Sequence, residues 1–440
     1  MNFFFLIIVI FFLQNCSFDN KTGIWDNNIE EKNNKNDLFK DFKKIDPQQK
    51  KFDQTIVADK SLKFNLSPMI SNLNWSDYYY GAGNNLENFS YNNSNNIIFK
   101  SKKLTKHRVN KLLLYQNNNL IISDNKGNII LYSLSEEKII SKFNFYKKKY
   151  KKIEKKLNLI INKKIIYVSD NIGYFYAYDY EKNKIIWAKN LKIPFRSNIK
   201  IHKNKIFTAN QENTLLIFNN KNGNLIKKIP TEETILKNQF INNLSISNNT
   251  LFFLNSYGSL YSLDIGNLKL NWFLNLNQSL EINSRFIFDG SGITNNQNVI
   301  IVSSYSDTYI IDKFSGNIIK KFNFSYSSSP IIDKNYIFII TKNNFLVAID
   351  LKNYEIIYSY NISSQIKDNL KKYSNDLNIS KMFLANGKIM LLDDSHIFNF
   401  NPNGKFNNLI KLSNKINSLP IFISQKFLYL NNKNKLVILN

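Results

Sequence analysis

From about residue 100 to its end, the chain alternates apolar and polar residues in paired short runs separated by polar turns. Alternation of this kind predicts β-strands with one buried face. The clearest copies of the pair are 165–179, 251–264, 299–312 and 337–350. Weaker copies are 120–135, 206–219, 389–401 and 427–440. The ends of the eight copies lie on average about 44 residues apart, a period typical of the four-stranded blades of a β-propeller.

A third strand follows the pairs and carries a bulky side chain at a fixed place. Eight residues after the first seven end positions, the chain has in order Phe143, Trp187, Lys227, Trp272, Lys320, Tyr358 and Leu409. A ring that recurs in the blades suits the packing of neighbouring blades, which is the surface that stacked repeats must bury. We therefore expect Phe143, Trp187, Trp272 and Tyr358 to be structural rather than to stack on a ligand.

The last copy ends at Asn440, so its blade lacks an outer strand. Because an unpaired sheet edge invites mispairing, we expect the missing strand to come from before the first copy. Residues 96–101 (NIIFKS) resemble residues 184–189 (KIIWAK), with Phe99 in the aromatic position. The sequence thus predicts an all-β fold. It is an eight-bladed β-propeller of four-stranded antiparallel blades, and the ring is closed by an N-terminal strand over about 96–102.

The first sixteen residues predict export. Phe3 to Leu13 is an uninterrupted apolar run, too short for a transmembrane helix of roughly 20 residues and suited to the core of a signal peptide. The only cysteine, Cys16, lies three residues after this run. Leu13-x-x-Cys16 resembles the bacterial lipobox, in which the thiol is acylated, and Ser17 resembles the outer-membrane sorting pattern. The alternative is an ordinary cleaved signal peptide with an incidental cysteine.

These patterns divide the chain into three segments. Residues 1–16 are expected to be the lipoprotein signal peptide and lipobox. Residues 17–65 are rich in Asn, Lys, Asp and Gln, and predict a flexible tether. Residues 66–440 are expected to form the propeller. Since the chain has only 13 glycines, we expect asparagine to occupy many of the left-handed turn positions.

Composition narrows the classes of function. A formal charge of +26 points to polyanions, whereas 43% hydrophobic residues exclude a disordered basic tail. One cysteine excludes a disulfide scaffold and a cysteine-based zinc site, and His107, His202 and His396 lie too far apart in sequence to suggest a metal cluster. We therefore expect no cofactor, no metal and no catalytic residues. Because an exported protein meets little nucleic acid, the charge is interpreted as surface charge.

The densest basic run is Lys147–Lys156, in the connection from the first repeat to the second, and Glu154 is its only acid. Such runs bind nucleic acid or anionic lipid headgroups, and no nucleic-acid-binding motif accompanies this one. A solvated loop is the first interpretation. Contact with anionic lipid or lipopolysaccharide is the alternative.

The repeat resembles the PQQ-type β-propeller repeat, whose pattern is roughly Gly-x-Leu-x-Ala-Leu-Asp followed by a Trp. Residues 173–179 (GYFYAYD) with Trp187 carry the likeness, as do residues 258–264 (GSLYSLD) with Trp272. Together with the lipobox, the chain resembles the BamB family of outer-membrane assembly lipoproteins over about 70–440.

Two shorter segments also resemble this family. Asn74-Trp75 with Gly81-Ala-Gly83-Asn84 is similar to a Trp…Gly-Gly-Asn segment that precedes the first blade. Ile193–Ser197 is similar to a loop that contacts the BamA-type barrel protein through an apolar residue and an arginine. The resemblance implies that Phe195, as an exposed anchor, and Arg196, as a planar fork, bind this partner. The alternative is that Phe195 packs under the loop and Arg196 forms a solvated pair.

The resemblance implies a non-catalytic scaffold, lipid-anchored in the outer membrane through Cys16, with a monomeric propeller in the periplasm. It implies binding of the BamA-type protein and of unfolded outer-membrane proteins, whose strands would pair with exposed blade edges. The enzymatic alternative is a PQQ-dependent dehydrogenase, which shares the repeat. Such enzymes hold a quinone and a calcium ion with buried acids, and no such cluster of Asp and Glu stands out in the sequence.

Overall fold

A computed structural model describes residues 52–59, 61–233, 241–277, 288, 290–369, 377, 379 and 381–440, and the backbone of 17–18 and 25–26. The chain divides into two compact units, residues 1–50 and 51–440. In the first unit, β1 (Ser17–Phe18) pairs with β2 (Trp25–Asp26) in antiparallel register. The signal peptide and Cys16 lie outside the described residues. Among the described residues, no helix combines the length and apolar character needed to cross a membrane.

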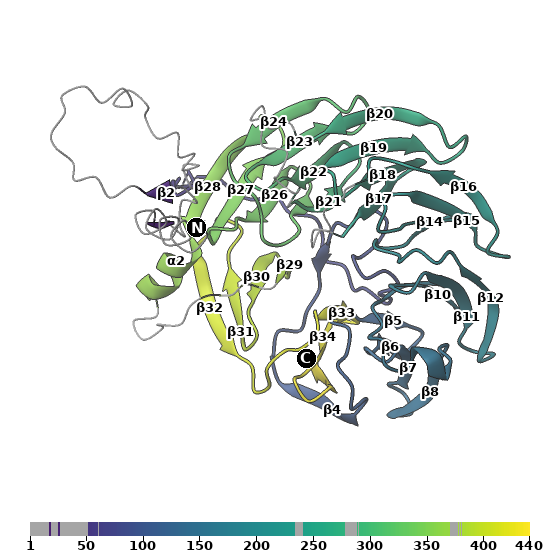
Figure 1. The fold of residues 1–440 in the computed structure, drawn as a ribbon. Helices are drawn as coiled ribbons and strands as arrows, with labels where there is room; N and C mark the ends of the chain where they lie inside the picture. Colours follow the sequence, from purple (N-terminus) through teal and green to yellow (C-terminus); the bar gives the residue numbers. More distant parts are fainter. Residues whose placement is uncertain are drawn as a thin grey trace, which may run out of the picture. The chain divides into compact units, whose positions relative to one another are not determined.

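The described part of the second unit forms eight antiparallel sheets around one axis, which confirms the predicted propeller (Figure 1). We number the sheets as blades 1 to 8, each with its first strand innermost. Blade 1 contains β5 (Leu114–Gln116), β6 (Asn119–Ser123), β7 (Asn128–Ser133) and β8 (Lys138–Asn144). Blade 2 contains β9 (Leu157–Asn162), β10 (Ile165–Asp170), β11 (Tyr174–Asp179) and β12 (Lys184–Asn190). Blade 3 contains β13 (Lys200–His202), β14 (Lys205–Ala209), β15 (Leu215–Asn219) and β16 (Leu225–Ile229).

The next three blades follow the same order. Blade 4 contains β17 (Asn243–Ser247), β18 (Thr250–Leu254), β19 (Ser259–Asp264) and β20 (Leu270–Asn275). Blade 5 contains β21 (Ser291–Asn295), β22 (Val299–Ser303), β23 (Thr308–Asp312) and β24 (Ile318–Phe322). Blade 6 contains β25 (Ile331–Asp333), β26 (Tyr336–Ile340), β27 (Phe345–Asp350) and β28 (Glu355–Asn361), and helix α2 (Ile362–Asn369) follows it.

The last two blades draw on residues from the N-terminal side of blade 1. Blade 7 contains β29 (Lys381–Ala385), β30 (Lys388–Leu392), β31 (His396–Phe400) and β32 (Phe406–Lys411), and β3 (Asn88–Phe89) lies parallel to β29. Blade 8 contains β33 (Ile421–Ile423), β34 (Lys426–Leu430), β35 (Lys435–Leu439) and, as its outer strand, β4 (Ile97–Lys103).

The ring closes where the two ends of the propeller pair. β4 lies antiparallel to β35, with Phe99 opposite Ile438. The Asn95 N–H donates to the Asn440 carbonyl oxygen at 2.7 Å and so extends the ladder beyond the strand. The predicted closing strand is confirmed.

The middle strands of the blades are buried on both faces, because each blade packs against a neighbour on either side. In β7, Ile129, Ile130 and Leu131 are all fully buried. Such strands carry apolar residues at consecutive positions, so the alternation seen in the sequence is only partial.

The turn between the second and third strands is built in the same way in all eight blades. A side-chain oxygen at its first position accepts a hydrogen bond from a backbone N–H two to four residues later, which short polar side chains allow. The capping residues are Asp124, Asp170, Asn210, Asn255, Ser304, Thr341, Asp393 and Asn431. Three residues after the cap, asparagine takes the positive φ that glycine supplies in other blades, at Asn213, Asn344 and Asn434.

The repeated ring of the outer strand packs against the next blade. Trp187 of β12 donates its indole N–H to the Asn220 carbonyl of blade 3, and Trp272 of β20 donates in the same way to the Lys313 carbonyl of blade 5, both at 3.0 Å. The smaller rings also face the next blade. Phe143 stacks on Tyr178 with ring centroids 4.1 Å apart, and Phe99 lies 6.4 Å from Tyr132.

A glycine in the facing turn makes room for the largest rings. A Cβ atom on Gly223 or Gly316 would lie 2.5 or 2.6 Å from the tryptophan of the preceding blade. Tyr358 and Gly404 form the same pair between blades 6 and 7. Each ring therefore depends on a residue without a side chain about 40 positions further along the chain.

In the junctions between blades 3 and 4 and between blades 5 and 6, the outer strand lacks the ring and the facing turn has a large side chain instead of glycine. Lys227 and Lys320 stand in place of the ring, and the facing turn position holds Leu268 and Tyr354, both with φ of 58°. A left-handed conformation costs such residues roughly 1–2 kcal/mol. The side chains of Leu268 and Tyr354 thus fill part of the volume that a ring on the outer strand occupies in other junctions, and their left-handed backbone costs some stability.

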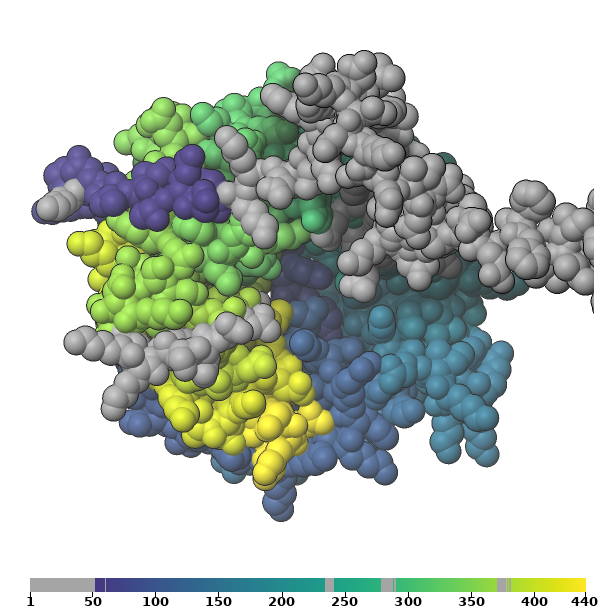
Figure 2. Space-filling view, turned by 60° about the vertical axis from the view of Figure 1, so that its left-hand side comes forward, coloured from purple at the N-terminus to yellow at the C-terminus, as the bar shows by residue number. Residues whose placement is uncertain are grey.

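Residues before the first blade contact the propeller earlier than the predicted boundary at 65/66. Ile56 pairs with Ser359 of β28 through two backbone hydrogen bonds of 2.9 and 3.0 Å. Phe52 packs on Phe324 with ring centroids 4.8 Å apart, and Phe64 packs against blade 6. Figure 2 shows this purple segment lying across the green blades. Among the described residues of the second unit, packing against the propeller is thus present from Phe52 onward, inside the segment predicted as a tether.

Gly223→Ala is expected to lower the free energy of unfolding by about 2–3 kcal/mol, because its Cβ would meet the Trp187 ring and φ is +68°. Gly81 is the matched control, with φ of +69° and no heavy atom within 4 Å of a built Cβ. Gly81→Ala should therefore cost only about 1 kcal/mol, the conformational part. Urea unfolding measures both, and equal losses would contradict the packing role of Gly223.

Candidate functional site

Residues 72–92, which we call the axial segment, lie inside the ring of inner strands and meet every blade. The segment starts and ends at blade 8, so its contacts make one full circuit of the inner strands. Its contacts, in the order of the chain, are Asn72 with blade 8, Trp75 with blade 1, Ser76 with blade 2, Asp77 with blade 3, Ala82 with blade 4, Gly83 with blade 5, Asn85 with blade 6, Asn88 with blade 7 and Asn92 with blade 8 again. The chain itself thus contacts the inner strands of all eight blades.

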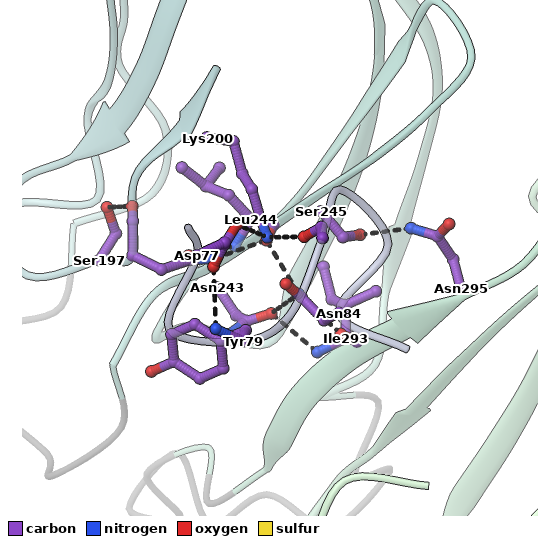
Figure 3. Close-up of polar contacts among 12 residues, drawn as sticks. Asp77, Tyr79, Asn84, Ser197, Lys200, Asn243, Leu244, Ser245, Ile293 and Asn295 are labelled. Carbon is purple, nitrogen blue, oxygen red and sulfur yellow. Dashed lines mark hydrogen bonds and ion pairs between the residues drawn. The ribbon is translucent and has the colours of Figure 1, made fainter. Parts of the chain in front are cut away.

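A buried ion pair holds the axial segment to blade 3 (Figure 3). The Lys200 Nζ donates to the Asp77 carboxylate at 2.5 Å and to the Gly81 carbonyl at 2.6 Å. The side chains of Lys200 and Asp77 are 1% and 8% exposed. Burial lowers the pKa of the Lys200 ammonium, and the facing carboxylate opposes this shift. Since Asp77 also accepts the Tyr79 N–H at 2.8 Å, both charges have partners.

Asn84 joins the axial segment to blades 4 and 5. Its amide donates to the Leu244 carbonyl at 3.0 Å and to the Ile293 carbonyl at 2.9 Å (Figure 3). A Cβ on the preceding Gly83 would lie 2.7 Å from the Asn295 carbonyl oxygen. The Gly-Asn pair therefore combines a close backbone approach with a side chain that satisfies two inner strands.

A small cavity lies beside the axial segment among the described residues. This cavity of about 10 Å³, lined in part by Trp75, Leu86 and Lys381, has room for about one water molecule. Burial lowers the pKa of Lys381 to about 8 and raises the pKa of Tyr79, another lining residue, to about 12. Within the described ranges, no group of three or more His, Cys, Asp or Glu side chains is arranged to hold a metal ion.

The predicted partner loop, 193–197, connects blades 2 and 3. Phe195 is 3% exposed and packs on Phe175, with ring centroids 5.5 Å apart, in a core shared with Trp187. Phe195 is therefore not an exposed anchor, because the junction of blades 2 and 3 encloses its ring. Arg196 is partly buried, which lowers its pKa, and its backbone N–H donates to the Ala209 carbonyl at 2.9 Å.

The basic run 147–156 forms a connection whose backbone is fixed by hydrogen bonds at its two ends. Tyr146 donates its hydroxyl hydrogen bond to Asp170, and Lys155, which is 2% exposed, donates to the Tyr150 carbonyl. The other lysines of the run are exposed, so they extend from an anchored backbone. Binding of anionic lipid by this loop stays a prediction.

Residues 126–360, more than half of the chain, match the family described as outer membrane protein assembly factor BamB. The chain belongs to the BamB family. A comparison with curated proteins finds no significant match.

Solved structures with the same fold differ in function. The chain is similar to BamB from Moraxella catarrhalis, with 12% identity and a TM-score of 0.60, over 77% of this chain and 99% of that one. It is also similar to a quinohemoprotein alcohol dehydrogenase from Comamonas testosteroni, with 9% identity and a TM-score of 0.59, over 83% and 80%. A computationally designed protein, Ika8, matches with 9% identity and a TM-score of 0.59, over 78% and 99%. At such identity the likeness is one of fold, which does not choose a function.

The axial segment is the feature of this BamB-family chain that sequence reasoning missed. Asp77 lies in a loop and Lys200 begins a strand 123 positions later, so no local pattern pairs them. The resemblance of Gly83-Asn84 to a family segment drew attention to this part of the chain but did not predict that it lies inside the ring. The available signal was a glycine followed by a polar residue in a stretch without strand alternation, which suits close backbone approach.

Asp77→Asn is expected to lower the free energy of unfolding by about 3–5 kcal/mol, because it leaves the Lys200 ammonium buried without its counter-charge. Lys200→Met should cost a similar amount. The double variant should cost clearly less than the sum of the two, since it leaves no unpaired charge. Urea unfolding of the four proteins measures the coupling, and additive losses would show that the pair does not interact in this way.

Lys381→Met is expected to raise stability at pH 7, and this gain should shrink as the pH rises towards 10. The folded pKa of Lys381 is about 8 against 10.5 for the free side chain, so between these values the unfolded chain holds a proton that the folded chain has lost. The free energy of unfolding of the parent protein therefore rises with pH in this window, relative to the variant, by on the order of 1–2 kcal/mol. Urea unfolding of both proteins at pH 7 and 9.5 tests this, and a difference independent of pH would contradict it.

Proposed function

We propose that this BamB-family chain is a non-catalytic scaffold of the outer-membrane protein assembly machinery, which binds the BamA-type barrel protein and aids folding of outer-membrane proteins. The family match over more than half of the chain carries the proposal. The axial segment supports it, because it covers inner strands that a ligand inside the ring would otherwise contact.

The enzymatic alternative draws on the fold shared with a quinohemoprotein alcohol dehydrogenase. Pockets for cofactor-sized ligands measure roughly 300–1,000 Å³. The cavity beside the axial segment measures about 10 Å³. The residues on the axis do not fit a quinone unless the axial segment leaves, which would break the Asp77–Lys200 pair and the Asn84 bonds. This geometry favours the scaffold.

We assign the partner contact to the loop 193–197, with Arg196 meeting the partner and Phe195 as a positioning residue. The buried Phe195 ring and the Ser197 hydroxyl, which accepts the Ala209 N–H at 2.6 Å, hold the backbone on both sides of Arg196. A guanidinium on a rigid backbone loses little conformational freedom when it binds a carboxylate or carbonyl group.

Anchoring through an acylated Cys16 completes the proposal. Acyl chains contribute about 0.8 kcal/mol of membrane affinity for each buried methylene, and stable anchoring takes more than one chain. The propeller would then stay on the periplasmic face of the outer membrane, connected through residues 17–50.

Arg196→Ala is expected to reduce recovery of the BamA-type protein at least tenfold when the full-length chain is purified from its own envelope, since truncating an arginine at the energetic centre of an interface costs about 2 kcal/mol or more. Arg196→Lys should lose most of this binding as well, because a lysine lacks the planar fork.

Arg108→Ala is the matched control, because the Arg108 side chain is 71% exposed and pairs with Glu154, which is not a residue of the loop 193–197. It should leave recovery unchanged. Thermal unfolding of each variant separates loss of contact from loss of fold. Unchanged recovery with Arg196→Ala would remove the loop from the interface, and absence of the barrel protein from the parent sample would reject the scaffold function.

A further inference from the structure

The junction between blades 3 and 4 lacks the ring that fills its neighbours. Trp187 and Trp272 occupy the outer-strand position in the junctions on either side. Here Lys227 is exposed, and its Nζ donates to the Leu268 carbonyl at 2.8 Å. A groove of about 360 Å³ lies between β16 and β20 as a result.

We call this groove the 3–4 groove. Its floor is apolar, and its side chains are fixed by burial and hydrogen bonds. Phe253 is fully buried in it, and Tyr261 donates its hydroxyl hydrogen bond to Glu232. The Glu232 carboxylate also accepts from Asn255 and Ser259, both at 3.0 Å. On the wall, Leu270 is 55% exposed and adds apolar surface that a bound segment would cover.

The rim of the 3–4 groove is basic. Lys227, Lys228 and Lys269 line it and are all exposed. Glu232 keeps its negative charge, because the three groups that donate to it are neutral, and the lysines outnumber it. The groove therefore combines an apolar interior with an excess of positive charge at its mouth, which suits a segment that carries acidic residues beside an apolar one.

The chain itself fills the equivalent junction between blades 5 and 6, where Lys320 replaces the ring. Phe52 packs on Phe324 there, with ring centroids 4.8 Å apart. Four residues later, Ile56 pairs with Ser359 on the outer strand β28. An extended segment thus places one ring in the junction and pairs its backbone with the edge of the blade.

The strand register shows which residues of blade 4 correspond to the docking site on blade 6. Tyr261 pairs with Phe273 as Val347 pairs with Ser359, so Phe273 on β20 corresponds to Ser359 on β28. Ser359 is fully buried beneath the docked segment, whereas Phe273 is 47% exposed. No described residue pairs with the edge of blade 4 at the place where Ile56 covers the edge of blade 6.

We propose that the 3–4 groove binds an extended segment of a partner protein, with an aromatic side chain in the groove, backbone pairing to β20 near Phe273, and acidic residues beside the three rim lysines. The docked segment of the chain has this form, since Phe52 is followed by Asp53 and the segment ends at Asp59. Backbone pairing supplies affinity in such contacts and the side-chain pocket supplies specificity. The inference does not depend on binding of the BamA-type protein.

The probe is a labelled synthetic peptide with the sequence of residues 51–60 (KFDQTIVADK), titrated with the purified full-length protein. The tethered copy of this sequence occupies blade 6, which leaves the 3–4 groove for the added peptide. Saturable binding is expected, weakened at least tenfold by Phe52→Ala in the peptide and weakened by salt. Absence of saturable binding, or equal binding of the Phe52→Ala peptide, would overturn the proposal.

The deciding variant combines Lys227→Trp with Leu268→Gly, which rebuilds the Trp–Gly pair of the neighbouring junctions and fills the groove. It should weaken peptide binding at least tenfold and keep a cooperative thermal transition. The matched control, Ile318→Asp, introduces an acid at an exposed outer-strand position of blade 5, outside the groove, and should change binding less than twofold. Leu270→Asp, at an exposed position, tests the groove without repacking and should also weaken binding at least tenfold.

Two results would reject a partner segment as the occupant. If the Lys227→Trp, Leu268→Gly protein or the Leu270→Asp protein binds the peptide as tightly as the parent, the peptide binds elsewhere. If the parent protein dimerises through the groove without peptide, and the filled variant does not, the occupant is a second copy of the chain.

Discussion

Closure of the ring by β4 and β35 is the constraint on which the rest of the propeller depends. Every blade is apolar on both faces of its middle strands, so no blade can be left without a neighbour on either side. The pairing of Phe99 with Ile438 joins residues from opposite ends of the domain. Loop-closure entropy grows only slowly with length, so a long connection is tolerable once many blade contacts form. Closure also explains the axial segment, because the residues before β4 run through the middle of the ring.

The axial segment satisfies the inner strands that closure brings together. Backbone groups facing the axis need partners, and Trp75, Ala82 and Gly83 supply them through the main chain. The Asp77–Lys200 pair contributes little net free energy when intact, but breaking it leaves a buried charge, so it specifies one position of the segment. Because the axial segment covers the inner strands, the contacts that we propose lie at the loops and the outer edges, at Arg196 and at the 3–4 groove.

Sequence reasoning recovered the fold better than the site, for physical reasons. Blade number and closure follow from a strand pattern repeated along the chain, and the outer-strand ring follows from a surface that each blade must bury. The likeness to the BamB family located the loop around Arg196, but a single apolar residue in a loop is as compatible with a core as with an anchor, and Phe195 lies in the core. The start of the packed region was placed too late, because Phe52, Ile56 and Phe64 dock separately and leave no periodic pattern.

The sequence by itself determined the repeating architecture of this protein, since strand period, turn capping and the aromatic position are local properties. Only the tertiary structure decided which distant residues meet, as Asp77 and Lys200 do across 123 positions. Lys227 and Lys320 occupy the same place in the repeat and look alike in sequence. One junction is filled by Phe52 and the other holds an open groove, because the contents of a junction depend on the volumes of side chains from two blades and on the path of a third segment.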